Sequence, residues 1–120
     1  MSYMPNDRIM LLGQCASIVH EITGLEPETC GIFVADHDAL FLETLNSHGP
    51  ERATRICGVT LMSDIARGQA YAAGLRHYGG TLEIALAIAE AVADDPACEA
   101  DGLAELARRT LALYRATRRN

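Results

Sequence analysis

The sequence predicts an all-α fold, a compact bundle of four main helices with short intervening helices, in a single helical domain over residues 1–120. Nineteen alanines and many leucines supply much of the apolar content, and these residues head the helix propensity scale. Apolar side chains also recur at helical spacing along four segments. With 120 residues and 49% hydrophobic content, the chain is long enough for one core and too short for two ordinary domains.

The first main helix is predicted over residues 7–23. Its apolar positions form two adjacent rows, which leaves only one narrow polar stripe: Gln14, Ser17 and Glu21. Asn6 or Asp7 caps its start, and Gly24 with Pro27 close behind supplies its end. We therefore expect more than half of the circumference of this helix to be buried.

Residues 30–35 fit two kinds of element. Pro27 suits the first position of a helix, and a short helix is the favoured prediction. The apolar run at residues 32–34 also fits a short strand, because β-branched and aromatic residues favour strands. Whether this segment is strand or helix stays open at the level of sequence.

Two further short helices are predicted before residue 58. One covers about residues 38–47, with Asp36 or Asp38 as its cap and Gly49 at its end. The other begins at Pro50, which suits a first helical turn. We expect this second helix to be brief and to end near residue 57.

The two central main helices are predicted over residues 61–78 and 81–94. Gly58 is expected to interrupt the chain before the first of them, Thr60 to cap it, and Gly79-Gly80 to end it. The second is apolar almost all round. Its polar positions form a single line: Glu83, Glu90 and Asp94. Such a helix belongs at the centre of a bundle or at a subunit interface.

The last main helix is predicted over residues 99–117, with a seam that faces inward. The seam residues are spaced by three or four: Leu103, Leu106, Thr110, Leu113 and Thr117. Five of the ten arginines lie in the last thirteen residues and are predicted opposite this seam: Arg108, Arg109, Arg115, Arg118 and Arg119. No acid follows Glu105, so this tail carries +5. The other five arginines and the sixteen acids leave −11, which gives the net charge of −6.

This charge pattern has two interpretations. In the first, Asp101 and Glu105 suit the positive end of the helix dipole and the arginines suit the negative end, while Glu105 pairs with Arg109 one turn away. In the second, the five arginines form a partner-binding face for an acidic protein, or for the acidic line of another subunit. Nucleic acid is disfavoured as a partner, because a body of −11 repels a polyanion at low salt.

Composition excludes several classes of function. The chain has no lysine, so Schiff-base catalysis and a P-loop lysine are ruled out. No apolar run is long enough for a signal peptide or a membrane span, which predicts a cytoplasmic protein without membrane contact. The four cysteines match no zinc or C-x-x-C spacing, and we expect buried free thiols. No catalytic motif is present, so no catalytic residue and no cofactor are predicted.

The favoured function is a small noncatalytic cytosolic module for protein interaction or regulation, although enzymatic activity stays an open question. The helices predicted over residues 7–23 and 81–94 carry more apolar surface than one small bundle covers. This surplus predicts a homodimer, with one of these two helices at the interface.

Two alternatives remain from other classes of function. A helical bundle can hold a small ligand, haem or a metal between facing helices. The side chains that suit such a site here are His20, Asp36, His37 and His77, together with a cysteine. The segment Gly58 to Thr60 with Ile65 also resembles the turn of a helix-turn-helix, which is a weak prediction of DNA binding. Its spacing is one residue too long, and the helix after it offers only two cations: Arg67 and Arg76.

Overall fold

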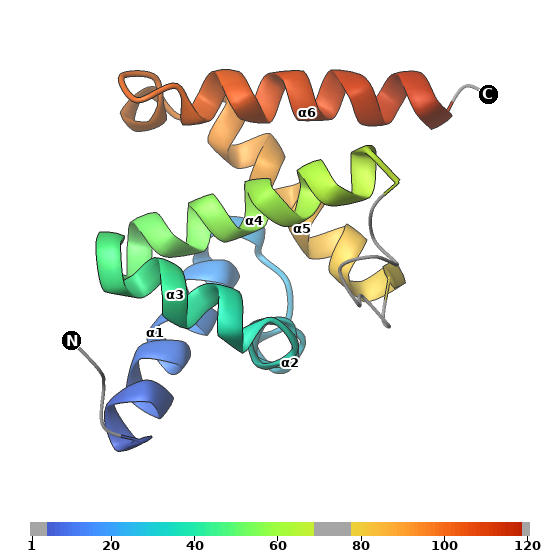
Figure 1. The fold of residues 1–120 in the computed structure, drawn as a ribbon. Coiled ribbons are helices and arrows are strands. Elements are labelled where there is room, and N and C mark those ends of the chain that lie inside the picture. The colour runs from blue at the N-terminus through green and yellow to red at the C-terminus, as the bar shows by residue number, and fades with distance from the viewer. Residues whose placement is uncertain (1–4, 69–77, 119–120) are drawn as a thin grey trace. The chain divides into compact units, whose positions relative to one another are not determined.

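The computed structural model describes residues 5–68 and 78–118, and all its regular structure in these ranges is helical (Figure 1). The elements are α1 (Pro5–Thr23), α2 (Pro27–Asp36), α3 (Asp38–His48), α4 (Pro50–Ala66), α5 (Tyr78–Ala93), a 3-10 helix η1 (Pro96–Cys98) and α6 (Leu103–Arg118). The all-α prediction is therefore confirmed, and residues 30–35 belong to a helix. No helix in the described ranges has the length and apolar content needed to cross a membrane.

Contacts within the chain divide it into two units, one ending at Cys57 and the other beginning at Gly58. The first unit contains α1, α2, α3 and the first half of α4. The second contains the rest of α4, α5, η1 and α6. The single domain predicted over residues 1–120 stays a prediction.

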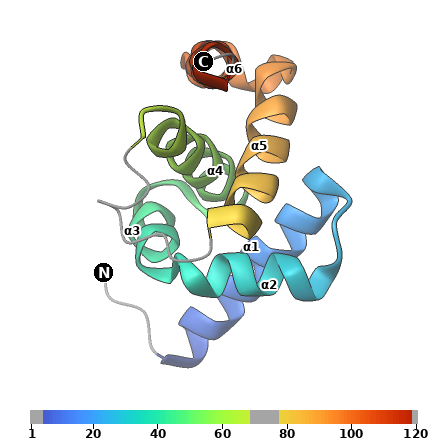
Figure 2. The same cartoon turned by 90° about the vertical axis from the view of Figure 1, so that its right-hand side faces the viewer.

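In the first unit, α1 packs against both α2 and α3, and α2 crosses it in Figure 2. Cys15 and Val19 are the wholly buried residues of α1. Phe33 of α2 meets Phe41 of α3 edge to face, with ring centroids 6.0 Å apart, a favourable aromatic geometry. The outer face of α1 contains the predicted polar stripe, since Gln14, Ser17 and Glu21 are exposed.

Glycine and proline mark helix ends of the first unit as predicted, whereas two predicted caps are wrong. Gly24 has a φ of 71° and donates its N–H to the carbonyl of His20, as expected for the end of α1. Pro27 occupies the first turn of α2. Helix α1 begins at Pro5, so Asn6 and Asp7 lie inside its first turn and do not cap it. The capping position of α3 is His37, which makes no side-chain capping hydrogen bond, whereas Asp36 ends α2 and Asp38 begins α3.

The structure contradicts the predicted break at Gly58. Helix α4 runs without interruption through both Gly58 and Thr60, so Thr60 caps nothing and the helix-turn-helix turn is not formed. Gly58 packs against Ile88 of α5, and a Cβ at position 58 would lie only 2.7 Å from the Cβ of Ile88. The glycine is thus a site of close helix contact. Packing offsets its low helix propensity.

The boundaries of the following helix also differ from the prediction. Helix α4 ends at Ala66, where Gly68 has a φ of 71° and donates to the carbonyl of Ile65. Residues 69–77, which include His77 and much of the predicted 61–78 helix, lie outside the described residues. Gly79-Gly80 do not end a helix but fall in the first turn of α5. The glycine penalty applies to helix interiors and is smaller in this first turn.

In the second unit, α6 packs across one end of α5 (Figure 1). Helix α5 turns a row of isoleucine, valine and alanine toward the core: Ile84, Ala85, Ile88, Ala89 and Val92. The three acids predicted as its polar line are exposed. The apolar surface of α5 is therefore largely covered within the chain.

The four cysteines are buried free thiols, as predicted. Cys57 donates to Thr44 Oγ1 at 3.6 Å, and Cys30 donates to the Leu25 carbonyl at 3.7 Å. Burial raises the pKa of Cys57 to about 12, although the hydrogen bond with Thr44 opposes this. Burial also raises the pKa of Cys15 and Cys30. These thiols are protonated at neutral pH and are poor nucleophiles.

Gly58→Ala tests the contact between α4 and α5. Overpacking costs roughly 1–3 kcal/mol and alanine regains up to about 1 kcal/mol of helix propensity, so we expect the free energy of unfolding to fall. Gly31→Ala in α2 is the control, because a Cβ there meets nothing within 4 Å. It is expected to raise the free energy of unfolding. Urea unfolding followed by circular dichroism measures both, and equal shifts would contradict the close contact.

The thiols provide a second test. We expect none of the four to react with a disulfide reagent at pH 8 within minutes, and all four to react in denaturant. The folded protein also binds the Cys57 proton more tightly than the unfolded chain. Its free energy of unfolding therefore falls as the pH rises from about 9 toward about 12. Rapid native labelling of Cys57 would contradict its burial.

Candidate functional site

The buried face of α6 differs from the predicted seam. Its core residues are Leu103, Ala104, Ala107, Thr110, Leu111 and Tyr114. Leu106, Leu113 and Thr117, which were predicted to face inward, are exposed. The prediction was wrong because it placed the leucines of this helix in the core, whereas alanines occupy part of the buried face. The small Ala104 and Ala107 lie at the contact face of α6.

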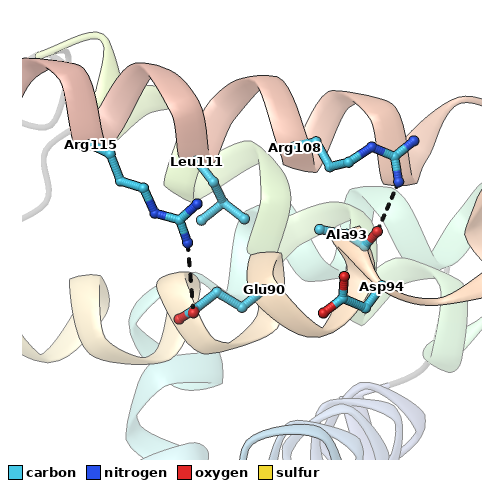
Figure 3. Close-up of a pocket in the computed structure, with 6 residues that line it drawn as sticks. All are labelled: Glu90, Ala93, Asp94, Arg108, Leu111 and Arg115. Carbon is cyan, nitrogen blue, oxygen red and sulfur yellow. Dashed lines mark hydrogen bonds and ion pairs between the residues drawn. The ribbon is translucent and has the colours of Figure 1, made fainter.

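Because α6 turns a different face inward than predicted, the arginines of the predicted partner-binding face lie in different environments. Arg108 and Arg115 lie on the flank of α6 that faces α5, and both line the same pocket (Figure 3). Arg109 lies on another side of the helix. The side chain of Arg118 and the whole of Arg119 lie outside the described residues.

Arg108 is a hydrogen-bonding hub. Its Nη1 donates to the Ala93 carbonyl at 2.9 Å and to Glu99 Oε1 at 2.8 Å. Its Nη2 donates to Glu99 Oε2 at 3.2 Å and to Glu105 Oε2 at 3.0 Å, and its Nε donates to Glu105 Oε2 at 3.2 Å. A guanidinium has five N–H donors, so all are used. Arg108 joins the end of α5, the residue after η1 and the first turn of α6.

The charges of this hub stabilise one another. Hydrogen bonds from Arg108 lower the pKa of Glu99 and of Glu105, and the two carboxylates raise the pKa of Arg108. Glu105 also forms the predicted pair with Arg109, with 3.3 Å between Oε1 and Nε. Glu99 was not predicted, because it lies nine residues before Arg108 and outside α6. A fork-shaped guanidinium suits two carboxylates better than a lysine would.

A pocket of about 340 Å³ lies beside this hub, between α5 and α6 (Figure 3). Six residues line it: Glu90, Ala93, Asp94, Arg108, Leu111 and Arg115. Nη2 of Arg115 lies 3.9 Å from Oε2 of Glu90, which is a loose ion pair within the same chain. Glu90 had been considered as a contact for the arginines of another subunit. The lining has charged groups of both signs and no serine, cysteine or histidine that could serve as a nucleophile or a histidine base.

The other side of α6 carries an exposed strip of residues at heptad spacing. Leu106 and Leu113 are 47% and 42% exposed, and Arg109, between them, has a side chain that is 78% exposed. Ala116 is exposed one turn beyond Leu113. We call these four residues the outer strip. Their spacing places Leu106 and Leu113 in one row and Arg109 and Ala116 in the next, as in the contact seam of paired helices.

The residues predicted to hold a ligand do not gather in the described structure. His20, near the end of α1, has its Nδ1 2.6 Å from the Leu25 carbonyl. His37 packs edge-on to Phe33, and burial lowers its pKa while Asp36 opposes this. His77 lies outside the described residues. Across residues 5–68 and 78–118, no three His, Cys, Asp or Glu side chains could hold a metal ion together. The ligand hypothesis stays a prediction.

Arg108→Lys tests the hub, because lysine keeps the charge but cannot make the forked hydrogen bonds. We expect a lower melting temperature at pH 7 than for Arg109→Lys, the control, which loses only one hydrogen bond. The lowered pKa values of Glu99 and Glu105 stabilise the fold above about 4.5, their ordinary value. This stabilisation is lost as the pH falls below that value and through the lowered pKa values, so the difference between the two variants should shrink as the solution is acidified. Equal melting temperatures at pH 7 would contradict the role of the hub.

Comparison with protein-family models, curated proteins and solved structures finds no match to this chain. An all-α fold by itself hosts many unrelated functions. Function must therefore be inferred from the helix faces that contacts within the chain leave exposed.

Proposed function

We propose that the protein is a noncatalytic interaction module, and that the outer strip of α6 binds an acidic amphipathic helix of a partner protein. The observation that carries this proposal is the exposure of two leucines one heptad apart, with Arg109 between them. A helix that pairs with this strip would bury both leucines and place a carboxylate against the guanidinium. Helix recognition of this kind uses anchors at heptad-related spacing.

The bonding of the arginines supports this choice of contact. Arg108 has no N–H donor left for a partner, and Arg115 lies beside Glu90 on the other flank. Arg109 makes one hydrogen bond, from Nε to Glu105, which leaves its two terminal nitrogens available. Among the arginines whose side chains the structure describes, we therefore keep only Arg109 in the proposed partner-binding set, and we add Leu106 and Leu113. The leucines contribute apolar area, and the arginine contributes specificity for acid.

We also propose that the protein forms a homodimer in the cytoplasm. The two helices considered for its interface differ in the structure. Helix α5 has most of its apolar residues buried, whereas the beginning of α1 does not. In α1, Ile9 and Met10 are exposed, and Leu11 and Leu12 are only partly buried. This difference favours α1.

The acidic-helix proposal can be tested with a synthetic peptide that has leucines at its heptad contact positions and glutamates elsewhere. Fluorescence anisotropy of the labelled peptide should give saturable binding. Leu106→Gln with Leu113→Gln should weaken it at least about tenfold, because two apolar contacts of roughly 1 kcal/mol each are lost. Arg109→Gln should weaken it about two- to fivefold, as is typical of an exposed ion pair.

Two controls are matched to these variants. One makes the same change of charge outside the strip, and the other keeps the shape of the peptide but removes its charge. Arg67→Gln removes an exposed arginine of α4 that pairs with Asp64 outside the strip, and it should leave binding unchanged. A peptide with glutamine in place of glutamate should bind more weakly and lose its sensitivity to Arg109→Gln. Binding that does not depend on the two leucines would refute the outer strip as the contact.

A further inference from the structure

The pocket between α5 and α6 contains three charged side chains that make no hydrogen bond within the part of the chain that the structure describes. Nη2 of Arg115 lies 3.9 Å from Oε2 of Glu90, which is longer than a hydrogen bond, and the carboxylate of Asp94 has no partner there. The fourth charged residue of the lining, Arg108, has all of its N–H groups occupied. Arg115, Glu90 and Asp94 are therefore the groups that a ligand in this pocket can bind.

The two acids of the pocket occupy positions that disfavour their charge. Glu90 lies in the last turn of α5, and Asp94 directly follows this helix. The C-terminal end of a helix carries partial negative charge, so carboxylates are disfavoured there. Like charges four residues apart also repel each other. Arg115 offsets only part of this cost, because its ion pair is with Glu90 and is loose. A positively charged group between the two carboxylates would stabilise the end of α5.

We infer that this pocket binds a small zwitterion of the α-amino acid type. The ammonium group of the ligand lies between the carboxylates of Glu90 and Asp94, and its carboxylate accepts hydrogen bonds from Arg115. Figure 3 shows that the guanidinium of Arg115 extends from α6 toward Glu90, so a cation and an anion are neighbours in the lining. The two charged groups of an α-amino acid are attached to one carbon atom and suit such neighbours. A guanidinium is also well shaped for a carboxylate.

The mixture of charges disfavours simpler ligands. An anion without an ammonium group would be repelled by Glu90 and Asp94. A cation without an acidic group would be repelled by Arg115 and would leave its donors unsatisfied. For a bare metal ion, residues 5–68 and 78–118 provide no group of three His, Cys, Asp or Glu side chains that could hold it.

The size of the pocket limits the ligand. Its volume of about 340 Å³ is close to the lower end of the range of roughly 300–1,000 Å³ for ligand pockets. Its two apolar residues, Leu111 and Ala93, are 3% and 7% exposed, so they offer little apolar area and suit a short side chain. Glu90 and Arg115 have side chains that are 52% and 61% exposed. Exposed ion pairs contribute little, so we expect a dissociation constant of roughly 0.1–5 mM.

Titration of the ¹⁵N-labelled full chain with L-alanine, followed by NMR chemical shifts, tests the inference. Backbone amides around the pocket should shift and saturate, with a dissociation constant in the expected range. Propionate lacks the ammonium group of L-alanine, and ethylamine lacks its carboxylate. Each should bind at least about fivefold more weakly, because an ion pair is lost and a repulsion is left without compensation.

Two variants change the proposed ligand contacts. Arg115→Gln and Asp94→Asn should each weaken the binding of L-alanine about two- to fivefold, as is typical of an exposed ion pair. Arg115→Gln should also reduce the preference for L-alanine over ethylamine, because the carboxylate that distinguishes them loses its partner. A change that acted only through stability would weaken both ligands equally. Circular dichroism checks that each variant keeps its helical content.

The controls change charges of the same two helices outside the pocket. Arg109→Gln in α6 and Glu83→Gln in α5 should leave the binding of L-alanine unchanged. Absence of saturable shifts, or equal binding of L-alanine and either analogue, would refute the zwitterion site. Equal constants for the pocket variants and the controls would refute this pocket as the site. The inference is independent of the acidic-helix proposal, because Arg109→Gln is expected to weaken binding of the acidic peptide but not of L-alanine.

Discussion

Five hydrogen bonds from Arg108 join three parts of the second unit. The position of this side chain is closely defined, because each of its N–H groups has an oxygen acceptor: the carbonyl of Ala93, the carboxylate of Glu99 or the carboxylate of Glu105. It satisfies a carbonyl at the end of α5, holds the residue after η1 and joins the first turn of α6. Helix ends leave carbonyl groups without partners, and an arginine side chain from another helix is one way to satisfy them. The bonds of Arg108 and the burial of the small Ala104 and Ala107 are both consistent with the face of α6 that turns inward.

That orientation changes the meaning of the arginine-rich tail. Arg108 becomes a structural residue, and Arg115 approaches Glu90 of its own chain. The local charge interpretation explains the pair of Glu105 and Arg109, and it also explains why much of the positive charge is neutralised inside the unit. The same orientation leaves Leu106 and Leu113 exposed beside Arg109. Our functional proposal therefore rests on leucines that sequence periodicity had assigned to the core.

Glycines show why some boundaries could be predicted and others could not. Gly24 and Gly49 end helices with positive φ, and a glycine followed closely by proline is a local signal of such an end. Gly58 has no proline close behind it and lies inside α4 against Ile88, thirty residues later in the chain. Gly79-Gly80 likewise fall within the start of α5. Propensity alone cannot separate a glycine that ends a helix from one that admits a neighbouring helix.

The sequence by itself determined the all-α class, most helix positions in the first unit, the burial of the cysteines and the pairing of Glu105 with Arg109. Each of these follows from residue type or from contacts within one or two helical turns. Only the tertiary structure decided the continuity of α4, the rotation of α6 and the bonds between Arg108 and Glu99. These depend on which helix face meets which neighbour. The spacing of apolar residues leaves that choice open when alanines and leucines occupy several sides of the same helix.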